Sequence, residues 1–185
     1  PLYPQHLGPD VRDGLLGLRA RGHILGLARL RQIRHRQGQG PPRRQGLPAV
    51  DRGLLRARAG RILRALSHGR SELSISLVDD AEIAALNAAY RGRRGPTDVL
   101  AFSLREGEGV EHRGKLLGDV VIGLGAAARQ ARARHRAVDE EVARLLIHGT
   151  LHLLGYQHHH EREARAMRAE ERRLWRAARV RCAAK

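Results

Sequence analysis

The sequence predicts an α+β protein with a small mixed β-sheet of about three to four strands, packed with about five helices. Three observations lead to this fold class. Segments with strand-like alternation lie between residues 72 and 124, segments with helical spacing surround them, and the longest helical segments gather at the C-terminal end. The 185 residues, 42% of them hydrophobic, are enough for one core of ordinary size.

The first 46 residues differ from the rest in charge and in turn-forming residues. Nine arginines and only two acidic residues lie in the first 50 positions, together with Pro41, Pro42 and Pro48. A mitochondrial transit peptide is less favoured, because the segment contains no Ser or Thr. The chain starts at Pro1 rather than Met, which is consistent with a truncated or mis-started product. We expect residues 1–46 to be a basic extension, disordered or non-native, and residues 47–185 to form a single domain.

The regular pattern begins with a helix, a strand and a second helix. Residues 51–67 carry apolar side chains at helical spacing, and residues 72–78 alternate apolar side chains with serines, as a half-buried strand does. Asp79 or Asp80 is then placed to cap a helix that reaches Tyr90.

Two further strands and three helices complete the prediction. The Gly- and Pro-containing residues 91–98 indicate a loop, and residues 99–104 and 116–124 indicate strands joined by a polar connection. Three helical segments follow: about 125–135, a helix from a cap at Asp139 to about Leu154, and a highly charged helix at about 160–180.

The composition predicts an anionic partner and a reducing compartment. The formal net charge is +16, and 33 of the 35 basic residues are arginines, which hold phosphate with two parallel hydrogen bonds. Cys182 is the only cysteine, so no disulfide or thiolate metal site forms within the chain. Without a long apolar run or a secretory signal, we expect a soluble, cytoplasmic protein with no membrane partner.

Three histidines in the segment HGTLHLLGYQH, residues 148–158, have the spacing of a metal site. His148 and His152 are four residues apart, so they share one face of the predicted helix. On an unbroken helix His158 would lie about 9 Å further along and about 240° around, out of reach. Gly155 favours the left-handed conformation that ends a helix, so the returning chain brings His158 back. Three imidazoles with an open position describe a catalytic zinc site, with one Zn²⁺ per chain.

Two other interpretations of these histidines compete with a zinc nuclease. A pair of core histidines followed by an accidental run at His158, His159 and His160 is less favoured than a metal site, because it leaves the glycine unexplained. The spacing also matches metzincin metalloproteases, but Gly149 stands where those enzymes keep their general-base Glu.

The histidine segment closely resembles the H-G-x-L-H-L-x-G-Y-D-H signature of the YbeY endoribonucleases, and the similarity extends over about residues 47–180. Supporting stretches are ELSISLVDDAEIAALNAAYRG, GPTDVLAFS and LLGDVVIGL, in the family's order. The resemblance implies a single-strand-directed, zinc-dependent endoribonuclease in 16S rRNA 3′-end maturation and ribosome quality control. It implies His148, His152 and His158 as zinc ligands and catalytic residues, and Arg91 as the active-site arginine. It also implies the small ribosomal subunit, ribosomal proteins and an Era-type GTPase as partners.

The sequence departs from the family pattern at three places. Gln157 replaces the usual Asp, which we interpret as a partner that orients a histidine or a water. Ala101 and Ser103 replace Ser and Pro, and residues 1–45 match nothing in the family, so its first strand is not evident. The change at Gln157 leaves open a non-catalytic RNA-binding assembly factor with a weakened metal site. A metalloprotease, which the histidine spacing suggests, is a third and less favoured hypothesis.

Several other residues have both a functional and a structural interpretation. Thr97 and Asp98 are equally consistent with a place in the cleft and with turn chemistry, and Asp119 is more consistent with a structural role. The charged side chains of residues 160–180 indicate a solvated face with intrahelical ion pairs, and Trp175 is expected to pack on the body of the protein.

Overall fold

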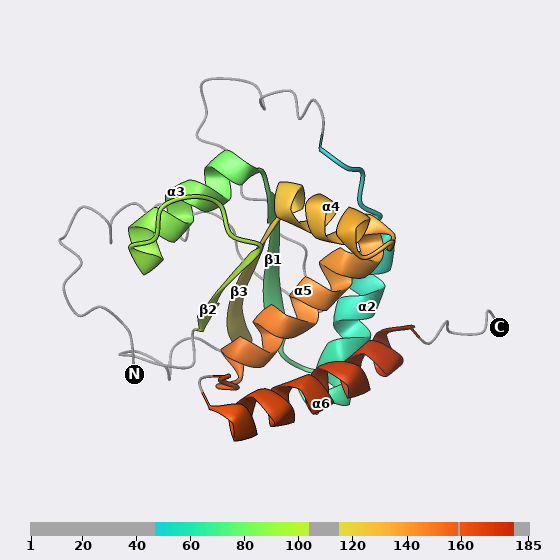
Figure 1. Ribbon diagram of the computed structural model, residues 1–185. Coiled ribbons are helices and arrows are strands. Elements are labelled where there is room, and N and C mark those ends of the chain that lie inside the picture. Colours follow the sequence, from blue (N-terminus) through green and yellow to red (C-terminus); the bar gives the residue numbers. More distant parts are fainter. Residues whose placement is uncertain (1–46, 104–114, 159, 180–185) are drawn as a thin grey trace.

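The computed structural model describes residues 47–103, 115–158 and 160–179 (Figure 1). The predicted extension at residues 1–46 and most of the predicted connection before residue 116 lie outside these ranges. Among the described residues, five helices accompany one sheet of three strands, which confirms the predicted α+β class.

The sheet is mixed and has the strand order β1-β3-β2. Strand β1 (Glu72–Val78) runs parallel to the central strand β3 (Leu116–Gly123), and β2 (Val99–Ser103) runs antiparallel to β3. Alternation along β3 sends Val120 and Ile122 into the larger core cluster and Val121 into the smaller one. The sheet is therefore covered on both faces.

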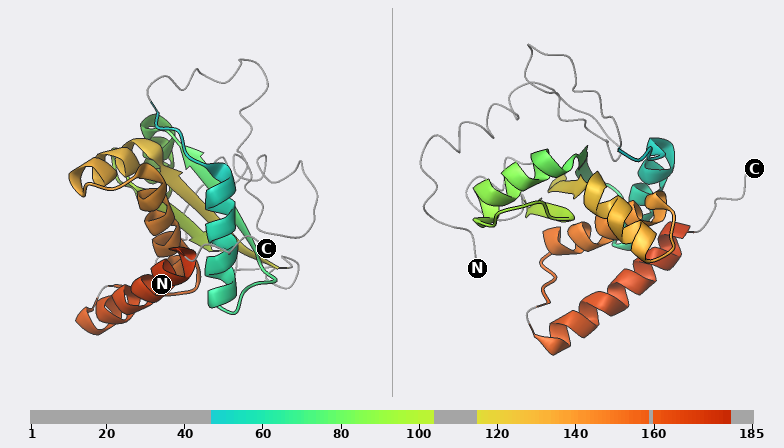
Figure 2. Two further views of the ribbon diagram at one scale, coloured as in Figure 1. Left: turned by 90° about the vertical axis from the view of Figure 1, so that its right-hand side faces the viewer. Right: turned by 45° about the horizontal axis from the view of Figure 1, so that its top comes forward.

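Helix α5 (Val138–Leu153) crosses one face of the sheet, where it contacts β2 and β3 (Figures 1 and 2). Helices α2 (Arg52–Ala65), α4 (Leu124–Ala133) and α6 (Glu161–Arg179) pack against α5. Helix α3 (Asp80–Arg91) contacts β3 and contributes Ile83 to the smaller cluster. This arrangement leaves α5 as the central helix of the larger core.

Of the two helix caps predicted from the sequence, that of α3 is confirmed and that of α5 is wrong. Of the two predicted caps of α3, Asp79 and Asp80, the structure uses Asp79, which also forms a capping box with Glu82. The predicted cap of α5 at Asp139 is wrong, because Ala137 takes the extended conformation and the helix begins at Val138. Asp139 instead lies in the first turn, where its charge suits the helix dipole and its side chain accepts a hydrogen bond from the Asp51 backbone N–H.

None of the helices in the described part of the chain is both long and apolar enough to cross a bilayer.

Candidate metal centre

Helix α5 presents one narrow stripe of side chains that are not buried. Between residues 141 and 153 ten residues are buried, and the three that remain partly exposed are Arg144, His148 and His152. These three follow one another at intervals of four, which places them along one side of the helix. The helix therefore holds two of the predicted ligands on a rigid, well-packed element.

The turn after α5 brings the third histidine to this stripe. Gly155 has φ 88°, and the backbone N–H groups of Gly155 and Tyr156 donate to the carbonyls of His152 and Leu151, both at 3.1 Å. This pair of hydrogen bonds is a Schellman motif, which ends the helix and reverses the chain. The predicted glycine stop is confirmed, and His158 follows it in the connection between α5 and α6.

The structure brings His148, His152 and His158 into one cluster. One ring nitrogen from each lies within 4.8 Å of the others. The Nε2 atoms of His148 and His152 are 3.1 Å apart. Two nitrogens of a tetrahedral zinc site, each about 2.0–2.1 Å from the ion, lie about 3.3 Å apart. The spacing of the cluster therefore fits a small tetrahedral ion.

The hydrogen bonds of the other ring nitrogens also fit a metal site. His148 Nδ1 lies 2.8 Å from Glu171 Oε1, and His152 Nδ1 lies 2.9 Å from the Tyr156 carbonyl oxygen. A carbonyl and an ionised carboxylate only accept, so both Nδ1 atoms carry the proton and, in the neutral rings, both Nε2 atoms present lone pairs. Two lone pairs facing each other at 3.1 Å repel unless a cation or a proton lies between them. The donor set therefore suits Zn²⁺, which imidazole nitrogens bind well.

Burial keeps His152 in the form that binds a metal. Its pKa is lowered to about 4, first by burial and then by the charges of His148 and His158. The ring is therefore neutral at pH 7, so no proton has to leave His152 when an ion binds.

Arg91, the predicted phosphate-binding residue, lies near this cluster. It is the last residue of α3 and is exposed, and the left-handed Gly92 caps the helix directly after it. The charge of Arg91 is among the causes that lower the pKa of His152. A positive charge at the end of α3 therefore acts on His152.

Gly149 lies at the closest approach between α5 and the sheet. A Cβ atom at this position would lie 2.8 Å from Val120 Cγ1 and 3.1 Å from Val99 Cγ2. Glycine here is required by packing, and a larger side chain would point into the sheet rather than toward the histidines. The position that holds the base in metzincins is therefore closed to a Glu in this fold.

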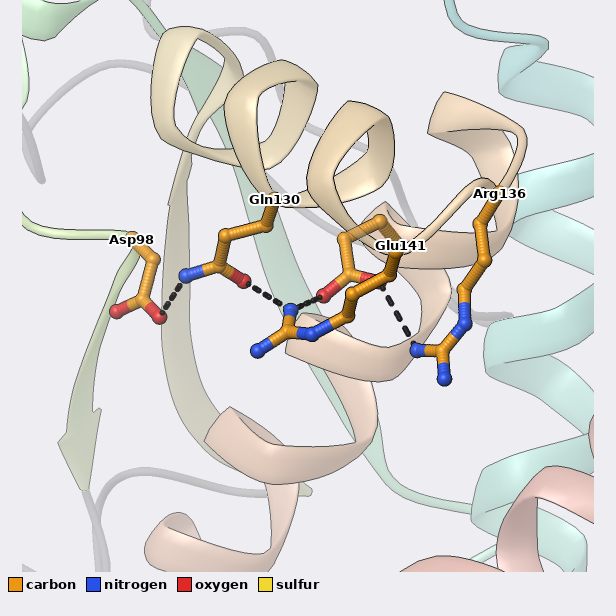
Figure 3. Close-up of polar contacts among 5 residues, drawn as sticks. Asp98, Gln130, Arg136 and Glu141 are labelled. Carbon is orange, nitrogen blue, oxygen red and sulfur yellow. Dashed lines mark hydrogen bonds and ion pairs between the residues drawn. The ribbon is translucent and has the colours of Figure 1, made fainter.

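Asp98 belongs to a polar network that links the start of β2 to helices α4 and α5 (Figure 3). Its side chain accepts hydrogen bonds from the Val99 backbone N–H at 2.8 Å and from Gln130 Nε2 at 2.9 Å. The network continues through Arg134 to the buried Glu141. These contacts hold the start of β2 against α4 and α5, so the turn interpretation of Asp98 accounts for its geometry.

Asp119 lies on the face of β3 opposite α5. It alternates with Val120, which belongs to the core under α5, and it pairs in register with Phe102 of β2. The ligand histidines lie on the α5 side, so Asp119 does not orient them.

The sequence prediction missed Glu171. The charged face of α6 was expected to be solvated, whereas Glu171 is half-buried and contacts His148. Gln157, the residue expected to orient a histidine, is exposed, and the acceptors for His148 and His152 are Glu171 and the Tyr156 carbonyl. No local signal separates Glu171 from the other glutamates of α6, because its partner lies 23 residues away on another helix.

His158 is the third member of the cluster, as its spacing predicted. His160 is exposed and lies outside the cluster, and His159 lies outside the described residues. Trp175 is packed, with 9% of its surface exposed, which confirms its predicted place in the body of the protein.

The fold and the site define a small α+β protein with a histidine-lined candidate metal centre on its central helix. Residues 53–179 match the family described as endoribonuclease YbeY. The match covers more than half of the chain, so the chain belongs to the YbeY family.

Proteins similar to this chain carry the same description. The endoribonuclease YbeY of Anaeromyxobacter sp. (strain Fw109-5) is 51% identical over 123 residues, which are 66% of this chain and 62% of that protein. The endoribonuclease YbeY of Pelotomaculum thermopropionicum is 48% identical over 134 residues, which are 69% of this chain and 88% of that protein. The solution structure of TM1509 from Thermotoga maritima is 26% identical, covers 67% of this chain and 78% of that chain, and has a TM-score of 0.49.

Proposed function

We propose that this protein is a single-strand-directed, zinc-dependent endoribonuclease that acts in 16S rRNA 3′-end maturation and ribosome quality control. The observation that carries the proposal is the convergence of His148, His152 and His158 within a chain of the YbeY family. Relatives that share about half of their aligned residues with this chain are described as endoribonucleases. The ribosomal proteins and Era-type GTPase implied by the resemblance belong to the same proposal.

In this proposal the three histidines hold the ion and the surrounding groups fix their rings. Glu171 and the Tyr156 carbonyl keep the protons of His148 and His152 on Nδ1, so that both Nε2 atoms face the ion. A zinc ion held this way supplies Lewis-acid activation of the phosphodiester and of the attacking nucleophile. Arg91 holds the scissile phosphate and stabilises the charge that develops on it.

The charge of the chain after its first 50 residues favours an RNA substrate. After the first 50 residues the chain has 26 basic and 17 acidic residues, which leaves a clear positive surplus outside the basic extension. Such a surplus supports binding to the phosphate backbone without base-specific contacts.

The test is cleavage of an unstructured oligoribonucleotide by wild type, His152→Ala and His160→Ala. His160 is a matched control, because it is an exposed histidine near the cluster but outside it. We expect wild type and His160→Ala to cleave, a chelator to stop both, and added Zn²⁺ to restore both. His152→Ala should stay inactive under all conditions.

Two outcomes would contradict the proposal. Equal cleavage by wild type and His152→Ala would show that the histidine cluster is not the active site. Binding of zinc and RNA by wild type without cleavage would favour the non-catalytic assembly factor.

A further inference from the structure

Arg144 continues the partly exposed stripe of α5 that carries the two histidines. It lies four residues before His148, about 6 Å along the helix axis. Helix α6 runs back along α5 and gives each residue a partner: Trp175 for Arg144 and Glu171 for His148 (Figure 1). Arg144 is therefore held next to the candidate metal centre by the same two helices.

The guanidinium of Arg144 is stacked on the indole of Trp175. Its Cζ atom lies 4.1 Å from the ring centroid, and those of Arg58 and Arg179 lie 5.8 and 5.7 Å from it. Contact with an aromatic face orients the planar guanidinium, and because Nε is buried, the donors left for a ligand are the terminal Nη groups. Trp175 itself is too buried to stack on a base.

The hydrogen-bonding capacity of Arg144 is not used within the described part of the chain. Its buried Nε has no hydrogen-bond partner there, although a buried donor of this kind normally has one. The nearby Glu141 is engaged instead by Arg134 and Arg136 (Figure 3). Arg144 thus has donors to offer but no carboxylate that pairs with it.

Charges of both signs act on Arg144, and that of Arg136 has the largest effect. The pKa of Arg144 is lowered first by burial and then by the charge of Arg136, while Glu141 and Glu140 act in the opposite direction. An anion placed against this guanidinium would offset the repulsion from Arg136 and Arg179 and accept hydrogen bonds from the terminal Nη groups. Arginine forks fit phosphate oxygens with two parallel hydrogen bonds.

We infer that Arg144, held flat by Trp175, forms a phosphate subsite for single-stranded RNA one helical turn from the histidine cluster. The subsite binds a phosphodiester that neighbours the scissile one and so sets the direction in which the strand crosses α5. RNA is the occupant because the same exposed stripe leads from Arg144 directly to His148. This inference rests on the proposed action on RNA.

The test uses Trp175, the only tryptophan of the chain, as a built-in reporter. The metal-free full-length protein is titrated with a ten-nucleotide oligouridylate, and tryptophan emission and RNA anisotropy are followed at several salt concentrations. The variant is Arg144→Met, which keeps an apolar stem on the indole but removes the charge and the donors. The control is Arg70→Met, which removes one exposed arginine from the connection between α2 and β1.

We expect wild type and Arg70→Met to change their emission when RNA binds. Arg144→Met should bind the oligonucleotide about tenfold more weakly, show no emission change, and lose about one unit of the slope of log affinity against log salt. Arg144→Lys, which keeps the charge without the fork, should recover only part of the affinity, and this variant also covers the case in which Arg144→Met fails to fold.

Three results would overturn the inference. The first is that wild type and Arg144→Met bind the RNA with equal affinity and equal salt slope. The second is that Arg144→Lys recovers the full RNA affinity of wild type. The third is that a polyglutamate peptide of the same charge changes the tryptophan emission as much as the RNA does. RNA cleavage is measured separately with zinc. If wild type cleaves RNA but Arg144→Met binds it as tightly as wild type, only the subsite is refuted. If RNA binding depends on Arg144 but wild type does not cleave, only the nuclease proposal is refuted.

Discussion

Replacement of Glu171 should weaken metal binding although this residue is not itself a ligand. Its carboxylate accepts the Nδ1 proton of His148 at 2.8 Å, and about one third of each side chain is exposed. Loss of such an outer partner typically reduces metal affinity 10- to 100-fold, or about 1.4 to 2.7 kcal/mol. Because solvent partly screens this pair, we expect the lower end: about tenfold for Glu171→Ala and less for Glu171→Gln, whose amide oxygen still accepts.

The assay is competition for Zn²⁺ between the metal-free protein and a chromophoric chelator at pH 7.5. Glu161→Gln is the control, because Glu161 lies on the same helix and pairs with exposed arginines instead of a histidine. Nitrogen NMR of the ligand rings gives a second measurement, in which Glu171→Ala should weaken the preference of His148 for the Nδ1–H tautomer. If Glu171→Ala keeps both the zinc affinity and the tautomer of wild type, Glu171 has no orienting role.

Three further predictions concern His152 and the glycines around it. The pKa of His152 is lowered to about 4 from the usual 6.5, so the unfolded chain takes up this proton first. The free energy of unfolding of the metal-free protein should therefore fall as the pH drops from about 6.5 to about 4. Urea denaturation at several pH values measures this, and His152→Gln should lose this part of the pH dependence. Gly149→Ala should lower the free energy of unfolding by about 1–3 kcal/mol, because its Cβ would lie 2.8 Å from a methyl group of Val120; an unchanged urea midpoint would contradict this. Gly155→Ala should cost about 1 kcal/mol through backbone strain alone, since nothing lies within 4 Å of its Cβ, and Gly155→Asn should cost less in the same assay.

Local sequence patterns were sufficient for most of the secondary structure. The alternation of Leu73 and Ile75 marks β1, and Asp79 or Asp80 marks the start of α3, because strand alternation and capping depend on residues close together in the chain. The start of α5 was placed wrongly at Asp139, since several residues near a helix start can serve as cap and the backbone conformation of Ala137 decides between them.

The histidine cluster was also predictable, for a similar reason. The interval of four between His148 and His152 and the glycine stop at Gly155 act within 11 residues, so the helix period and the left-handed turn together determine where His158 returns.

Only the tertiary structure decided which side chains surround this cluster. Glu171 and Trp175 meet His148 and Arg144 because α6 packs antiparallel along α5 in one particular register. A rotation of α6 by one residue would move each side chain by about 100° and break both contacts. The sequence by itself therefore determined the three histidines and the elements that carry them. The packing of α6 determined which residue orients the candidate metal centre and which arginine lies beside it.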